Sequence, residues 1–158
     1  MTRRPFLAFL SAVGLVPGIA ASQTPGVSKI EPVTLSDAQW KQRLSPAAYD
    51  VLRHEGTEYA GSSPLNNEHR KGRFHCAGCD LALFTSETKF DSGTGWPSFY
   101  QSLPGAVATK TDVKMFLPRT EYHCVKCGGH QGHIFDDGPA PTGKRYCNNG
   151  VALKFVAA

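Results

Sequence analysis

The five cysteines of the chain fall into two groups that point to different chemistry. Four of them form two CxxC pairs, CAGC at residues 76–79 and CVKC at residues 124–127. A two-residue spacing lets both thiolates of one turn point at a single tetrahedral ion, and four thiolates complete the coordination of zinc. The pattern predicts a closed structural zinc site whose ligands are Cys76, Cys79, Cys124 and Cys127.

Other interpretations of the CxxC pairs stay open on the sequence alone. The cysteines could be oxidised to disulfides, or one pair could be the redox centre of a thiol–disulfide oxidoreductase. A zinc-stabilised binding module without catalytic activity would have the same spacing. Residues 80–123 separate the pairs, which is longer than a compact zinc finger allows, so a small β domain is expected between them.

Cys147 is the fifth cysteine and stands alone in the sequence RYCNNG. Side chains alternate along a strand, so Arg145, Cys147 and Asn149 would share one face. Arginine would favour the thiolate, and asparagine could donate a hydrogen bond to an anion that forms during a reaction. A lone cysteine is also commonly a buried structural side chain, so the motif by itself leaves both roles open.

Histidine and aromatic residues add to the catalytic interpretation. The segment CGGHQGHIFDDG carries His130 and His133, and a histidine near a lone cysteine can act as an activating base or a general acid. Asp137 follows in the same segment. Trp96 and Phe99 lie in FDSGTGWPSFY, which we expect to be a loop, although core packing is the more common role of a tryptophan.

Two short helices followed by short strands must position these residues. Ser36 or Asp37 can cap a first helix that carries Trp40, and Ser45 followed by Pro46 predicts the start of a second helix. Apolar runs in the rest of the chain are short and broken by Gly, Pro and Asp, which is typical of strands. The expected strands are RFHC, LALF, VATKTDVKMFL, EYHC, HIF and a final strand RYCNNGVALKF, so the predicted fold is mainly β.

Residues 1–22 have the features of an export signal. Arg3 and Arg4 precede an apolar run, and small residues follow it, with cleavage expected after Ser22. TRRPFLA is similar to the twin-arginine pattern, while a general secretory signal with two chance arginines is the alternative. Gly14 and Pro17 interrupt the run, which argues against a permanent membrane span. We therefore expect a periplasmic protein.

The expected organisation is a linker at residues 23–34 and one domain at residues 35–158. The formal net charge is +4, with no run of five like charges and no basic patch interleaved with aromatic residues, so nucleic acid is not an expected partner. We expect a monomer. Export of the folded protein would let zinc be loaded before the cysteines meet an oxidising compartment.

A family resemblance extends from about residue 34 to residue 156 and is carried by GTEYAGSSPLNNEHRKGRFHCAGCDLALFTSETKFDSGTGWPSFY, RTEYHCVKCGGHQGHIFDDGPAPTGKRYCNNG and VALKF. These segments resemble the B-type methionine sulfoxide reductases, which act on the R epimer. The resemblance implies a fold of two antiparallel sheets with short N-terminal helices and a zinc ion held by both CxxC turns. It also implies that Cys147 is the nucleophile and that the other site residues are Trp96, Phe99, His130, His133, Phe135, Asp137, Arg145 and Asn149.

The implied reaction begins with attack of the Cys147 thiolate on the sulfoxide sulfur, and it yields methionine and a sulfenic acid on Cys147. His133 is assigned as the proton donor with His130 in support, and Asp137 as the carboxylate that orients the imidazole. Trp96 would form an apolar wall against the S-methyl group. Oxidised proteins or peptides are the expected substrates.

Several positions depart from the pattern of the family. Thr94 stands where many members have a second cysteine that resolves the sulfenic acid. Because the other four cysteines are assigned to zinc, an external thiol, such as a thioredoxin-like protein, is expected to restore Cys147. The remaining departures, which we expect to make the pocket rim more polar, are Gln131, Lys144, Asn148 and Gly150.

Overall fold

The computed structural model describes residues 30–114 and 117–158. The expected export signal and residues 23–29 of the expected linker lie outside the described residues. Residues 30–36 form no helix or strand, and the Val33 N–H donates to the Lys126 carbonyl at 2.6 Å. Within the described ranges, no helix is long and apolar enough to cross a membrane.

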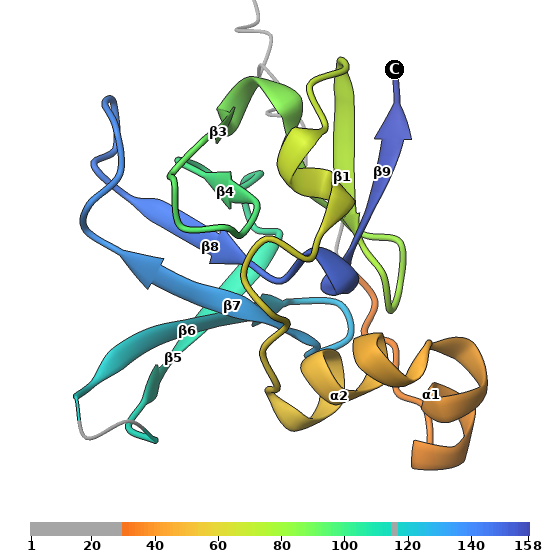
Figure 1. Ribbon diagram of the computed structural model, residues 1–158. Coiled ribbons are helices and arrows are strands. Elements are labelled where there is room, and N and C mark those ends of the chain that lie inside the picture. The colour runs from red at the N-terminus through yellow and green to blue at the C-terminus, as the bar shows by residue number, and fades with distance from the viewer. Residues whose placement is uncertain (1–29, 115–116) are drawn as a thin grey trace, which may run out of the picture.

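The strands of the described residues form two antiparallel sheets (Figure 1). The smaller sheet has the order β2-β1-β9 and contains β1 (Gly72–Cys76), β2 (Ala82–Thr85) and β9 (Leu153–Ala157). The larger sheet has the order β3-β4-β8-β7-β6-β5 and contains β3 (Lys89–Phe90), β4 (Ser98–Phe99), β5 (Val107–Asp112), β6 (Arg119–Cys124), β7 (His130–Phe135) and β8 (Arg145–Asn148). The prediction of a mainly β fold with two antiparallel sheets is confirmed.

Aromatic side chains from both sheets meet in the core. Phe84 of β2 stacks on Phe99 of β4 with ring centroids 4.2 Å apart, and Phe74 of β1 lies edge-on to Phe99 at 4.9 Å. Tyr122 of β6 packs edge-on against Phe84. Phe99 is fully buried in this cluster, so it packs behind the candidate site and presents no surface to a substrate.

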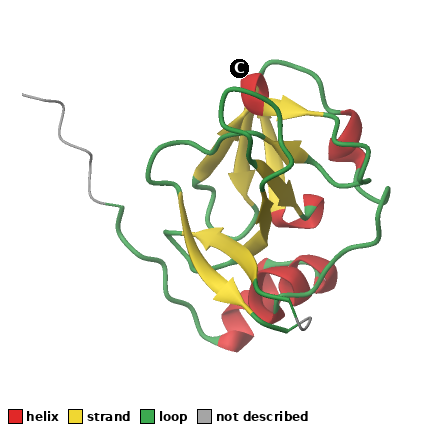
Figure 2. Ribbon diagram, turned by 90° about the vertical axis from the view of Figure 1, so that its left-hand side faces the viewer, coloured by secondary structure: helices red, strands yellow, loops and turns green. Residues whose placement is uncertain are grey.

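Two short helices begin at the capping residues that the sequence predicts. Ser36 caps α1 (Asp37–Arg43) and forms a capping box with Gln39, while Ser45 caps α2 (Pro46–His54). The two helices lie together at one end of the molecule, where α2 packs against β7 (Figures 1 and 2). Short 3-10 turns complete the described elements: η1 (Pro64–Asn67), η2 (Ser86–Thr88) and η3 (Gly150–Ala152).

The single final strand predicted from RYCNNGVALKF is instead two strands in different sheets, β8 and β9, separated by η3. The Glu58 carboxylate accepts the backbone N–H groups of Gly150 at 2.6 Å and Val151 at 3.0 Å, and these bonds hold the turn. A Cβ at Gly150 would lie 1.8 Å from the Ser63 hydroxyl, so only glycine fits there. The predicted alternation of side chains therefore ends with β8.

The segment FDSGTGWPSFY, predicted as a loop, includes strand residues at both ends. β3 pairs with β4, and β4 pairs with β8, which places Ser98 directly opposite Cys147. Between the strands, Gly93 and Gly95 have positive φ angles of 69° and 90°, so the chain turns sharply there. This pairing fixes the segment that carries Trp96 to the strand that carries Cys147.

Candidate functional site

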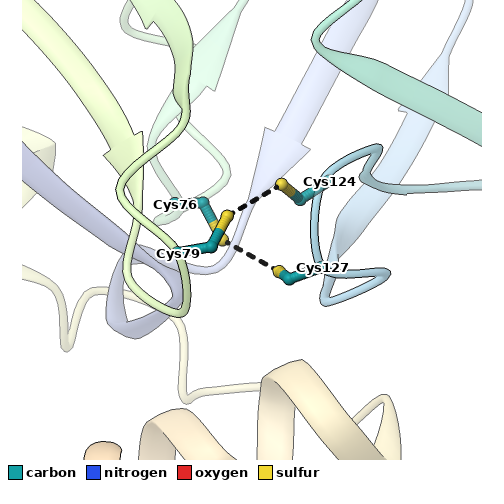
Figure 3. Close-up of side chains that lie close together, drawn as sticks. All are labelled: Cys76, Cys79, Cys124 and Cys127. Carbon is teal, nitrogen blue, oxygen red and sulfur yellow. Dashed lines mark hydrogen bonds between the residues drawn. The ribbon is translucent and has the colours of Figure 1, made fainter. Parts of the chain in front are cut away.

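The four cysteines of the CxxC pairs converge from the two sheets. Cys76 ends β1 and Cys124 ends β6, and Cys79 and Cys127 lie in the turns that follow. Figure 3 shows the four side chains pointing toward one another. The sulfurs of Cys76 and Cys127 are 3.6 Å apart, those of Cys79 and Cys124 are 3.4 Å apart, and all four lie within 4.8 Å of one another.

This geometry fits a metal ion better than disulfides. A disulfide bond is about 2.05 Å long, so the sulfurs are not bonded, and all five cysteines are free. Zinc–thiolate bonds of about 2.3 Å around a tetrahedral ion would place the sulfurs about 3.8 Å apart, close to the observed contacts. The four cysteines are therefore positioned to bind a metal ion, and the site is compatible with the predicted structural zinc.

The two CxxC turns have the same backbone arrangement. The Asp80 N–H donates to the Cys76 carbonyl at 2.9 Å, and the Gly128 N–H donates to the Cys124 carbonyl at 2.8 Å. Asp80 and Gly128 both have positive φ angles, 60° and 67°. The repeated turn brings both sulfurs of each pair to the same side of the chain, which explains why the four converge.

Cys147 lies on β8, between β4 and β7, at a pocket of about 140 Å³. It stands directly opposite His133 of β7 in the strand register. Gly132, next to His133, allows the close approach of the strands, because a Cβ there would lie 1.9 Å from the Cys147 carbonyl oxygen. The residues that line the pocket are Thr57, Trp96, Arg119, Gly132, His133, Phe135, Cys147, Asn148 and Asn149.

The electrostatic surroundings of Cys147 only partly favour a thiolate. Burial raises the pKa of the Cys147 thiol above its usual value, and Arg145 and the Thr94 hydroxyl act in the opposite direction. Arg145 lies over the Phe135 ring at 4.3 Å, and the Asp137 carboxylate accepts two hydrogen bonds from its guanidinium at 2.7 Å. Arg145 thus favours the thiolate, as predicted, but burial outweighs its effect.

His133 is oriented by Asp112 and not by Asp137, so the predicted carboxylate is wrong. The His133 Nε2–H donates to Asp112 Oδ2 at 2.7 Å, and the Arg119 guanidinium donates to the same oxygen at 2.6 Å. Burial lowers the pKa of His133, and the hydrogen bond to Asp112 partly opposes this effect. Bonds from the Lys114 backbone N–H, His133 and Arg119 hold the pKa of Asp112 well below its usual value.

His130 supports His133 from inside the protein. It is buried outside the pocket lining, its Nδ1 lies 2.7 Å from the Glu121 carboxylate, and its ring packs edge-on against His133 at 5.4 Å. Its Nε2 finds no hydrogen-bond partner within the described part of the chain. Contact between His130 and a substrate would therefore require the site to rearrange.

Trp96 and Asn149 are held by one residue, Glu58. The Trp96 indole N–H donates to the Glu58 carbonyl at 3.1 Å, and the Glu58 N–H donates to the Asn149 side-chain oxygen at 3.0 Å. The Asn149 amide in turn donates to the Gln131 carbonyl at 3.0 Å. Both side chains line the pocket, as predicted, in positions set by backbone groups.

The structure brings five of the predicted residues together at the pocket: Trp96, His133, Phe135, Cys147 and Asn149. His130, Asp137 and Arg145 are not part of the pocket lining, and Phe99 belongs to the core. Sequence reasoning missed Asp112, Arg119 and Glu58. The sequence held one signal for Arg119, in RTE at residues 119–121, shortly before a CxxC pair. Residues two apart on a strand lie on the same face, so Arg119 and Glu121 would place two charges on one face.

The fold and the site together define a β scaffold with four cysteines positioned to bind a metal ion and a fifth cysteine at a pocket. Residues 44–157 match the SelR domain. The chain is 51% identical over 130 residues to "Peptide methionine sulfoxide reductase B1, chloroplastic" of Arabidopsis thaliana, covering 82% of this chain and spanning 64% of the plant protein. It is 49% identical over 124 residues to "Peptide methionine sulfoxide reductase MsrB" of Agrobacterium fabrum, covering 78% of this chain and 92% of that protein.

A protein of the same name from Leptospira interrogans is 50% identical over 124 residues, which cover 78% of this chain and 95% of that protein. The chain therefore belongs to the SelR-domain family, together with these peptide methionine sulfoxide reductases. This finding confirms the family resemblance.

Alkylation of Cys147 at different pH values tests the electrostatics of the site. We expect its iodoacetamide reaction to rise with pH through a midpoint above that of an unburied cysteine peptide, because burial raises the pKa of the thiol. Arg145→Met should move the midpoint to still higher pH. The measurement is mass spectrometry of the peptide that contains Cys147.

The matched control is Lys144→Met, which also removes one positive charge but at an exposed side chain paired with Asp136. It should leave the midpoint unchanged. A midpoint below that of the free peptide, or no response to Arg145→Met, would contradict the account given for Cys147.

Proposed function

We propose that the chain reduces methionine-R-sulfoxide in oxidised proteins or peptides to methionine, with Cys147 as the nucleophile. The observation that carries this proposal is the pairing of Cys147 with His133, in a pocket walled by Trp96 and Phe135. A thiol, an imidazole and an apolar wall complement the electrophilic sulfur, polar oxygen and apolar methyl group of the substrate. Preference for the R epimer rests on the family resemblance.

The resting states of the two reacting groups fit the proton balance of this reaction. Burial favours a thiol on Cys147 and a neutral imidazole on His133. His133 donates from Nε2 to Asp112, which leaves Nδ1 to accept the thiol proton and pass it to the sulfoxide oxygen. The Cys147 sulfur attacks the sulfoxide sulfur and forms a transient sulfur–sulfur bond. The protonated oxygen then moves to the Cys147 sulfur as the sulfur–oxygen bond breaks. The sulfur–sulfur bond breaks with its electron pair going to methionine, which leaves, and Cys147 is left as a sulfenic acid.

An assay with separated epimers tests the proposed reaction. We expect a peptide with methionine-R-sulfoxide to be reduced and the S epimer to be left unchanged. Activity on the S epimer alone would contradict the proposal. A folded chain that reduces neither epimer would favour the binding module that the sequence left open.

Substitution of the two reacting groups tests their roles. Cys147→Ser should abolish reduction while the fold persists, because a hydroxyl is a poor nucleophile at neutral pH. His133→Gln should lower kcat by about 10²–10⁴-fold, the usual effect of losing a general acid or base. Full activity of Cys147→Ser would contradict Cys147 as the nucleophile. Turnover of insulin or a dithiol without zinc would instead favour a CxxC thiol–disulfide oxidoreductase.

We propose that an external thiol, such as a thioredoxin-like protein, reduces the sulfenic acid. Thr94, at the position of the family's second cysteine, carries a hydroxyl that cannot form a disulfide, and the CxxC cysteines are buried. Protein oxidised by substrate without reductant should keep a dimedone-reactive sulfenic acid on Cys147. A disulfide from Cys147 to any of the other four cysteines, detected by mass spectrometry, would refute this.

We propose that the four-cysteine site holds one structural zinc ion, because four thiolates leave no open position for a substrate. Metal analysis of the purified chain should give one zinc per chain. Chelation should lower the melting temperature, since metal binding contributes directly to folding free energy. A folded, metal-free chain whose CxxC cysteines do not titrate as thiols would contradict the zinc site.

We also propose that the protein is a periplasmic monomer, exported by the twin-arginine-like signal of residues 1–22 and free of a stable membrane span. The support is the sequence pattern of that segment. Fractionation of cells that produce the full chain, with Arg3 and Arg4 replaced by lysine as the comparison, checks the route. Retention of the unaltered chain in the cytoplasm would contradict it.

A further inference from the structure

We propose that Gln131 is a positioning residue that couples the four-cysteine site to the strand carrying Cys147. Gln131 lies on β7 between His130 and Gly132 and is fully buried. The register of β7 with β6 shifts here, since Tyr122 pairs with Gly132 and His123 pairs with His130. Gln131 is therefore the extra residue of a bulge, and a bulge re-aims the side chain that it carries.

The side chain of Gln131 reaches the candidate metal site. Its amide Nε2 donates to the Cys76 sulfur at 3.5 Å. Cys76 is one of the four converging cysteines, and its side chain is fully buried. A hydrogen bond to a thiolate is charge-assisted, and partners of this kind orient metal ligands and strengthen metal binding.

The backbone carbonyl and the side-chain oxygen of Gln131 lie near Asn148 and Asn149, the two residues that follow Cys147. The Gln131 carbonyl accepts the Asn149 backbone N–H at 2.9 Å and the Asn149 side-chain amide at 3.0 Å. The Gln131 Oε1 lies 3.5 Å from the Asn148 amide nitrogen, at the long end of the hydrogen-bonding range. One residue therefore contacts both a candidate metal ligand and the end of β8.

Asn148 completes a buried polar network with Gln131. Its side-chain oxygen accepts the Tyr122 hydroxyl at 2.6 Å, and its amide donates to the Asn149 carbonyl at 2.9 Å. Gln131, Asn148 and Tyr122 are each 0% exposed. Buried polar groups are costly unless they are paired, so each member of such a network constrains the others.

Gln131 and Asn148 are two of the positions where this chain departs from the family pattern, and the structure places them in contact. The expectation that Gln131 makes the pocket rim more polar is therefore wrong, because its side chain points into the interior toward Cys76. Because Gln131 and Asn148 contact each other through their side-chain amides, each supplies a polar partner that lets the other be buried in the core.

The test measures metal release and thiol reactivity on the metal-loaded full chain. A chromogenic chelator in excess reports the rate of zinc release, and iodoacetamide followed by mass spectrometry reports the reactivity of Cys147. The variants are Gln131→Met, Asn148→Ile and the double variant. Gln42→Met, at an exposed position of α1, is the matched control for the same chemical change.

We expect Gln131→Met to release zinc about 10–100-fold faster, the range by which such ligand partners affect metal affinity, and to change the alkylation rate of Cys147. Asn148→Ile should also speed release, although Asn148 contacts no cysteine of the metal site in the described hydrogen bonds. The double variant should release zinc no faster than Gln131→Met. Gln42→Met should match the unaltered chain.

Release from folded Gln131→Met at the rate of the unaltered chain would overturn the proposal. Release from Asn148→Ile at that rate would also overturn it, and this variant decides the matter if Gln131→Met fails to fold. The inference rests on the proposed metal site, so an unaltered chain that binds no metal overturns both. Metal release is measured independently of sulfoxide reduction, so failure of the proposed reaction is distinguishable from failure of this coupling.

Discussion

The convergence of four buried cysteines is the constraint on which the rest of the structure depends. Cys76 ends a strand of the smaller sheet and Cys124 ends a strand of the larger one, so a metal ion held by these cysteines would fasten the two sheets at one point. The aromatic cluster around Phe84 and Phe99 joins the same sheets through apolar contact. Together they hold β7 and β8 in the larger sheet at a set distance from the smaller one.

The chemistry of the pocket follows from where β8 lies in the larger sheet. Its neighbours bring an imidazole and an indole to the Cys147 thiol: β7 places His133 opposite Cys147, and β4 follows the segment that carries Trp96. Charged groups then act from outside the pocket, Asp112 on the imidazole and Asp137 on Arg145. Asp112 and Asp137 thus act on these charges without lining the pocket, whereas Arg119 both lines the pocket and donates to Asp112.

Local sequence signals predicted the parts of the molecule that local rules determine. The helix caps at Ser36 and Ser45, the convergent CxxC turns and most strands follow from spacing and residue type. The partners of His133 and Arg145 could not be derived in this way, because they depend on which strands are adjacent in the sheet. Asp112 is distant from His133 in sequence but lies near it across β6, whereas Asp137, only four residues away, turns toward Arg145. The break between β8 and β9 depends on Glu58, from a distant segment.

The role of Glu58 has a consequence for how the protein can vary. Its contacts to Trp96 and Asn149 come from its carbonyl and N–H, which every amino acid except proline provides. Only the bonds to Gly150 and Val151 require a carboxylate. The positions of Trp96 and Asn149 in the pocket therefore tolerate substitution of Glu58. The turn that takes the chain from β8 in one sheet to β9 in the other does not. Substitution of Glu58 would therefore change the path of the chain between β8 and β9 before it changed the shape of the pocket.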